Sequence, residues 1–181
     1  MIVRLALTTL LLMLLSQPGM AEPFTITDAT IEREQALYLL HAKIDYQLDS
    51  ELIEALHSGV TLPFKVIIEV YQPRRFLPDP EVAFLKQRYE LQYHALSRQY
   101  IVTNHNSSVS ESFSSLEYAL DGLGKIDGLP MLDHELLEAD NKYRVRIRAA
   151  INVSLLSVPL RLTSYFFGPW NSESKWWDMP L

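Results

Sequence analysis

The sequence predicts a mainly β protein: a single-domain antiparallel β-sandwich of the immunoglobulin-like type, with two short inserted helices. Apolar and polar residues alternate along four long segments, which is typical of strands with one buried and one solvated face. Strands that are half solvated favour antiparallel pairing, and few residues remain for helices. An α+β fold, with helices on one face of an antiparallel sheet, is the alternative that this pattern leaves open.

The alternation locates the strands along the chain. The long alternating segments are 36–48, 62–71, 88–95 and 142–153. In the first of them, every even position from Ala36 to Leu48 is apolar. Shorter strands are expected at 24–33, 98–104 and 159–167, which makes seven in all.

Two helices are expected between these strands. Asp49 and Ser50 are suited to cap a short helix that Gly59 ends. A second helix is expected over about 111–121, because apolar residues from Phe113 to Leu123 fall on one stripe and Gly122 and Gly124 follow. Residues 129–138 are a candidate for one further helical turn.

The first 21 residues are typical of a secretory signal peptide. Arg4 precedes an apolar run from Leu5 to Leu15, and small residues at Gly19 and Ala21 form a cleavage site. Eleven residues are short of the ~20 that a membrane-spanning helix needs, although an uncleaved anchor is the alternative. Residues 22–181 are then one exported, soluble periplasmic domain.

Composition excludes several classes of function. The 181 residues contain no cysteine, which removes disulfides, thiol catalysis and Cys-ligated zinc. The net charge of −6 argues against a nucleic-acid binder. No H-x-x-x-H pair, G-x-S-x-G elbow or glycine-rich phosphate loop is present. We therefore expect no catalytic, cofactor-binding or metal-binding residues, although a cross-strand pair of His41 and His94 is an open alternative.

Several stretches, taken in order, resemble the DUF4390 family of bacterial envelope proteins. They are 59–66, 88–97 with Tyr100, 113–120, 143–148, and a tail with Trp170, Ser174, Trp176 and Trp177. The resemblance covers nearly all of residues 22–181. It implies a Gram-negative source, export through the inner membrane, and a gene that lies beside those of a membrane histidine kinase and its response regulator. The family has no assigned molecular function, so no catalytic residue carries over.

An arginine stripe is the first candidate for partner binding. Arg144, Arg146 and Arg148 lie on one face of one predicted strand, about 6–7 Å apart, and therefore repel one another unless acids face them. The acids are either internal, from Glu69, Glu90 or the acidic segment 111–140, or belong to an external anionic partner. Arginine suits either role, because its guanidinium binds carboxylate or phosphate bidentately.

Aromatic and basic residues elsewhere are the other candidates. Trp170, Trp176 and Trp177 in the C-terminal tail either cap one end of the sandwich or form an exposed patch. Arg74, Arg75 and Phe76 lie in a proline-stiffened loop, which is either a plain connector or a contact site.

The sequence thus favours a non-enzymatic periplasmic module that binds an envelope protein, such as a membrane histidine kinase, and needs no cofactor. One alternative is an enzyme or small-ligand binder with a pocket between the sheet and the aromatic tail. Another is a peripheral binder of the membrane surface, through the stripe and the tail.

Overall fold

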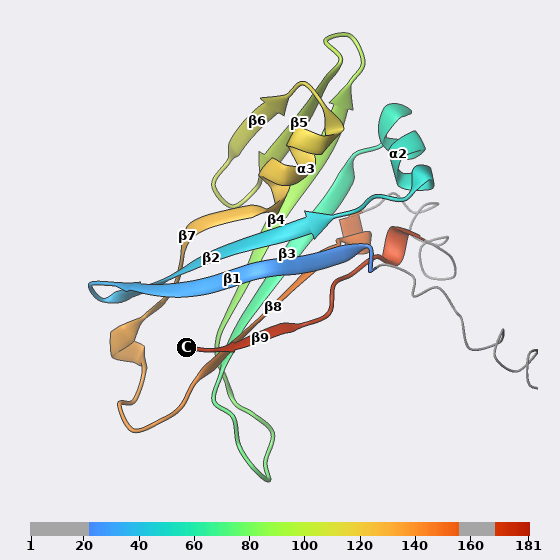
Figure 1. Cartoon of the computed structure of the whole chain (residues 1–181). Coiled ribbons are helices and arrows are strands. Elements are labelled where there is room, and N and C mark those ends of the chain that lie inside the picture. Colours follow the sequence, from blue (N-terminus) through green and yellow to red (C-terminus); the bar gives the residue numbers. More distant parts are fainter. Residues whose placement is uncertain (1–21, 156–168) are drawn as a thin grey trace, which may run out of the picture.

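Two antiparallel sheets and two short α-helices form the part of the chain that the computed structural model describes, residues 22–155 and 169–181 (Figure 1). The three-stranded sheet has the order β1-β2-β7, and the six-stranded sheet has the order β6-β5-β4-β3-β8-β9. The predicted fold class is therefore confirmed. The predicted signal peptide (1–21) and the predicted strand 159–167 lie outside the described residues.

The strands have the following bounds. The three-stranded sheet contains β1 (Phe24–Glu34), β2 (Leu37–Tyr46) and β7 (Lys125–Asp133). The six-stranded sheet contains β3 (Leu62–Tyr71), β4 (Glu81–His94), β5 (Gln99–Asn104), β6 (Val109–Phe113), β8 (Arg144–Ile151) and β9 (Trp177–Pro180). The alternation predicted the inner faces of the long strands correctly, since Leu40 to Tyr46 on β2 and Val145 to Ile151 on β8 are buried at alternate positions.

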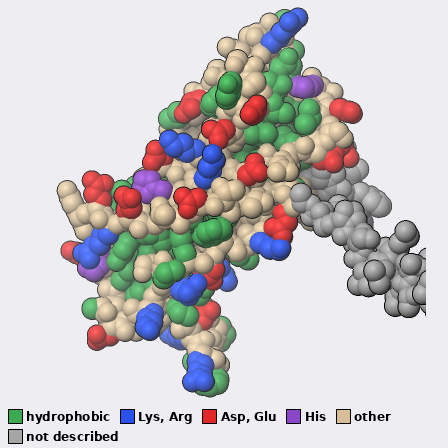
Figure 2. Space-filling model, in the orientation of Figure 1, with side chains coloured by type: hydrophobic (Ala, Val, Ile, Leu, Met, Phe, Trp, Pro, Cys, Tyr) green, Lys and Arg blue, Asp and Glu red, His purple; other side chains and the backbone are tan. Residues whose placement is uncertain are grey.

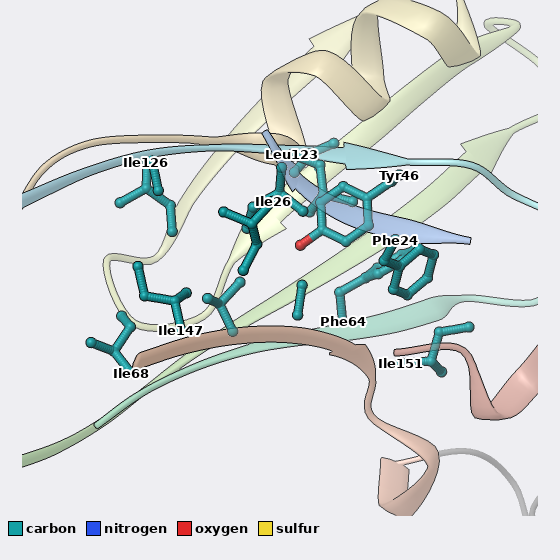
Figure 3. Close-up of a cluster of buried hydrophobic side chains, with 14 of the residues drawn as sticks. Phe24, Ile26, Tyr46, Phe64, Ile68, Leu123, Ile126, Ile147 and Ile151 are labelled. Atoms are coloured by element: carbon teal, nitrogen blue, oxygen red, sulfur yellow. The ribbon is translucent and has the colours of Figure 1, made fainter. Parts of the chain in front are cut away.

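The core lies between the three-stranded sheet and the central strands β3 and β8. Figure 3 shows its side chains reaching in from both sheets. On β3, the five inward residues from Leu62 to Val70 are completely buried. Three rings hold one end of the core together: Phe24 and Phe64 lie with their centroids 4.9 and 5.2 Å from that of Tyr46. Each contact is edge-to-face, the geometry that aromatic pairs prefer.

Helix α2 (Ser50–His57) forms as predicted. The Asp49 side chain accepts a hydrogen bond from the Glu51 amide at 2.8 Å, which caps the first turn. The backbone then leaves the helix at Gly59, whose φ of +88° is a conformation that other residues rarely adopt. Leu52 and Leu56 are the buried side chains of this helix.

The second helix differs from its prediction. Helix α3 spans Leu116–Gly124, with Ser115 as its N-cap. The segment assigned to its first turn is strand β6, because the backbone of residues 109–113 pairs with β5. Gly122 lies inside the helix rather than after it. Helical periodicity was correct for Ala119 and Leu123, which are buried, but tertiary pairing decided where the helix begins.

Three strands were not predicted as strands. They are β6, β7 and β9, and each lies at an edge of its sheet. Residues 129–138 were a candidate for one helical turn. Residues 129–133 instead belong to strand β7, and a single 3-10 turn, His134–Leu136, follows it. Its sequence contains Gly128 and Pro130 and does not alternate. It pairs with β2 through two register shifts, so its strand conformation depends on the partner.

A glycine sets the distance between α3 and β2. A Cβ atom on Gly124 would lie 2.0 Å from the backbone oxygen of Ile44, which cannot move without breaking the sheet. A Cβ atom on Gly122 would lie 2.6 Å from the ring of Phe113, a side chain that can rotate. A larger residue at position 124 would therefore clash with backbone, whereas at position 122 it would displace only the Phe113 ring.

We expect Gly124→Ala to lower the free energy of unfolding by about 3 kcal/mol or more, because the added methyl group forces the helix away from β2. Gly122→Ala is the matched control. There, a gain in helix propensity of about 1 kcal/mol opposes the displacement of one ring, so the net change is small. Urea denaturation measures both. Equal losses in the two variants would contradict the close-approach explanation.

The hydroxyl of Tyr46 lies among apolar side chains, as Figure 3 shows. It is buried and makes no hydrogen bond with any described residue. Burial therefore raises the pKa of Tyr46 far above its usual value of 10.0.

We expect Tyr46→Phe to stabilise the protein by about 1 kcal/mol, because it removes an unpaired polar group and keeps the ring. The raised pKa adds a pH dependence. The contribution of Tyr46 to stability is fully present below pH 10 and is lost as the pH rises above it. The hydroxyl then ionises in the unfolded chain but keeps its proton in the folded protein, so unfolding releases a proton. The wild type should lose stability above pH 10 more steeply than the variant. Thermal unfolding between pH 7 and 11 measures this, and parallel curves would contradict it.

Candidate functional site

The arginine stripe lies on the outer face of the six-stranded sheet, where each arginine has an acidic partner. The Arg146 Nε and Nη2 atoms lie 2.6 and 2.5 Å from Oε2 of Glu69, the residue directly opposite on β3. The Glu69 side chain is only 15% exposed, so this pair is partly shielded from water. The sequence named Glu69 as one possible internal partner, and the structure bears this out.

The other two arginines pair with the C-terminal segment. Arg144 Nε lies 2.6 Å from Oδ1 of Asp178 on β9, and the Tyr71 hydroxyl donates to the other oxygen of that carboxylate at 2.6 Å. Burial and this hydrogen bond raise the pKa of Tyr71. The hydrogen bond with Asp178 raises the pKa of Arg144. Arg148 makes a longer contact, 3.4 Å, with Glu173.

The two other proposed sources of acid do not pair with the stripe. Glu90 binds His105 at 3.1 Å instead. No described residue of the acidic segment 111–140 forms an ion pair with Arg144, Arg146 or Arg148. Sequence reasoning missed Asp178 and Glu173, because their positions depend on how the C-terminal segment pairs with β8. The four residues of β9 are too few to show an alternating pattern.

The three tryptophans have three different environments. Trp176 lies under the stripe: the guanidinium carbons of Arg146 and Arg148 are 4.9 and 4.5 Å from its ring centroid. This is the geometry of a cation–π contact, which partly offsets the repulsion between the two cations. Trp170 is 3% exposed, and its indole nitrogen donates to Glu51 on α2 at 2.7 Å. Trp177 is 36% exposed on edge strand β9.

Trp170 therefore anchors the C-terminal segment to one end of the sandwich, which is the structural alternative given for the tail. Backbone bonds reinforce it, since the Ser174 amide donates to the oxygen of Ala149 at 2.8 Å and its hydroxyl accepts from the amide of the same residue at 3.0 Å. The tail does not form a single aromatic patch. Of its tryptophans, Trp176 and Trp177 alone remain accessible.

The loop between β3 and β4 holds the remaining candidates. It projects from the sheet as a long tip, at the lower end of the molecule in Figure 1. Basic and hydrophobic side chains gather at this projection in Figure 2. Phe76 is 87% exposed and Leu77 is 64% exposed, with the guanidinium of Arg75 5.4 Å from the Phe76 ring.

The loop is held in one shape despite its exposure. The Gln72 amide donates to the oxygen of Pro80 at 3.1 Å and closes the base of the loop. The Arg74 amide donates to the Asp79 carboxylate at 2.6 Å, which braces its interior. Prolines at 73, 78 and 80 restrict the backbone further. Its tip is thus presented at little further cost in conformational entropy.

The structure does not bring His41 and His94 together. His41 lies on β2 of the three-stranded sheet, 3.0 Å from Asp127, whereas His94 lies on β4 of the other sheet and contacts Ser97 at 2.9 Å. Among the described residues, His, Asp and Glu side chains do not come together in any group of three or more that could hold a metal ion. A pocket of 400 Å³ beside Pro180 and Leu181 has no tryptophan in its lining.

The whole domain, rather than a catalytic motif, assigns this chain to a family. A family model described as a domain of unknown function, DUF4390, matches residues 21–180. The chain belongs to the DUF4390 family. No curated protein and no solved structure is significantly similar to it. Within the part of this DUF4390 domain that the structure describes, every helix is too short or too polar to cross a lipid bilayer.

The Arg146–Glu69 pair should contribute to stability. We expect Arg146→Met to lower the free energy of unfolding by about 1–2 kcal/mol, because it leaves a shielded carboxylate without its partner. Arg75→Met, on the exposed loop, is the matched control and should change stability by less than ~0.5 kcal/mol. A double-mutant cycle that adds Glu69→Gln, measured by urea denaturation, gives the coupling free energy between Arg146 and Glu69. Strict additivity of the two substitutions would contradict the pair's role.

Proposed function

We propose that this DUF4390 protein is a non-enzymatic interaction module of the bacterial envelope, exported to the periplasm, that binds another envelope protein. A membrane histidine kinase is the partner that the family resemblance suggests. The contact surface that we propose is the β3–β4 loop tip, formed by Arg74, Arg75, Phe76 and Leu77, with the accessible edge of the stripe beside it.

One observation carries the proposal: two large apolar side chains stand almost fully exposed at the tip of a braced loop. Exposing Phe76 and Leu77 gives the isolated protein no packing energy, whereas a partner's pocket would bury both. Aromatic and arginine side chains are the types that dominate protein-binding energy. The loop combines both types in four successive residues.

The arginine stripe has a secondary part in this proposal. Its guanidinium groups already have internal acids, so their charge is largely used in holding β8 against β3 and β9. Arg144 begins β8 and Tyr71 ends β3, so the stripe's first residue and the base of the loop lie at one end of the sheet. We therefore place the main contact on the loop.

We expect a photo-crosslinking residue at position 76 to capture one dominant envelope protein in living cells. Position 96 is the matched control, because Leu96 is 94% exposed in the turn at the other end of β4. Arg74→Glu with Arg75→Glu should reduce capture at least fivefold, and higher salt should weaken it. Folding should be unaffected, since these side chains are exposed.

Equal capture from positions 76 and 96, or capture that survives both charge reversals, would contradict the proposal. The membrane alternative makes a different prediction, because an apolar tip flanked by arginines also suits an anionic lipid surface. Purified protein that floats with phosphatidylglycerol vesicles, and loses this on Phe76→Ser, would support that alternative instead.

A further inference from the structure

The inner face of the six-stranded sheet has a polar corner where a sandwich normally buries apolar residues. The register places Gln87 opposite Val66, on the face that forms the core. The same face continues with three more polar positions, one further along β4 and one on each of the next two strands, β5 and β6. The four residues of this corner are Gln87, Tyr89, Asn104 and Glu111.

The corner exists because the two sheets differ in width. Three strands cannot cover the inner face of six, and β7 is the last strand of the smaller sheet on this side. Between β7 and the polar corner lies an open groove of about 540 Å³, one wall of which is formed by residues 125–130. A hollow of 220 Å³ adjoins it and shares Tyr89, Asn104 and Glu111.

Gln87 is the residue that most needs an explanation. The residue is 7% exposed and lines the groove, and its side-chain amide makes no hydrogen bond with any residue of the described ranges. The amide atoms are not among the fully buried unpaired ones, so they face the open space of the groove. Core-facing positions usually hold apolar side chains, and Gln87 is one of the few buried polar residues of this chain. Its two donors and one acceptor are therefore available to a molecule in the groove.

The other polar groups also have capacity to spare. Burial raises the pKa of Tyr89, so its hydroxyl keeps its proton and can donate as well as accept. The side-chain oxygen Oδ1 of Asn104 accepts hydrogen bonds from the backbone amides of Asn106 and Ser107, at 2.8 and 3.3 Å. The side-chain NH2 group of Asn104 is left as a donor. Glu111 forms no ion pair within the described residues and supplies two acceptors.

Charge in the groove is low. The one cation of its lining, Lys125, lies 3.2 Å from Asp127, which is also bound by His41. Only Glu111 adds an unbalanced charge. A phosphate or other anion would meet this carboxylate without a free cation to hold it, so recognition has to rest on hydrogen bonds.

We propose that this groove binds a small uncharged saccharide. Each sugar hydroxyl both donates and accepts, which matches amides, a phenol and a carboxylate placed together. The groove's volume falls within the ~300–1,000 Å³ typical of small-molecule sites and accommodates a mono- or disaccharide. Gln87 contributes the buried hydrogen bonds, and Glu111 accepts from hydroxyls at the mouth.

The test is a titration of the full-length mature protein with maltose, cellobiose and N,N′-diacetylchitobiose, followed by NMR. We expect at least one of them to shift the side-chain amide signals of Gln87 and the backbone signals of residues 125–130 in a saturable way. Gln87→Leu should weaken that binding at least tenfold. Gln99→Leu is the matched control, because it makes the same change at an exposed position of β5 and should leave affinity unchanged.

The proposal is overturned if none of the three sugars produces saturable shifts. It is also overturned if the shifts persist in Gln87→Leu, or if spermidine binds in place of the sugars through Glu111. Gln87→Leu is expected to fold, since it places an apolar side chain of similar size at a core-facing position. It should leave crosslinking at position 76 intact, so failure here is separable from failure of the proposed interaction.

Discussion

The unequal width of the two sheets is the constraint on which the rest of the structure depends. Three strands cover β3 and β8, and there the inner face is completely apolar. Beyond β7 the same face of the larger sheet has no opposing strand, and helix α3 covers only part of it. Where the groove opens, four inner positions of β4, β5 and β6 are polar, since an apolar surface left in contact with water would cost free energy. Core and groove are thus two consequences of one architecture.

The close approach of α3 to β2 follows from the same constraint. A short helix replaces the missing strands over part of the larger sheet, and it can lie close to the core only if its last turn presents no side chain to the backbone of β2. Gly124 satisfies that requirement. On the opposite, outer face, the repulsion within the arginine stripe is relieved by Glu69, Asp178 and Glu173. These acids join β8 to its neighbours on both sides.

Three features of this molecule differ in whether their side chains already have partners within the fold, and the difference bears on function. The stripe is charged and conspicuous in sequence, yet its groups are already paired and act chiefly within the fold. Gln87 is inconspicuous in sequence, yet its amide faces the groove without a hydrogen-bond partner among the described residues. The loop tip is a third case, in which apolar residues are exposed on a braced turn. Accessible groups without internal partners, rather than paired charges, therefore indicate where another molecule can bind.

The sequence by itself determined the mainly β class, the inner faces of the long strands and the position of α2. These features follow from period-two alternation and from capping residues, which act over a few neighbouring positions. Tertiary structure decided the edge strands β6, β7 and β9, whose irregular segments become strands only against a partner. It also decided the acids that face the stripe and the burial of Trp170. Those contacts join residues up to 119 positions apart, and their formation depends on strand order and register, which no local pattern encodes.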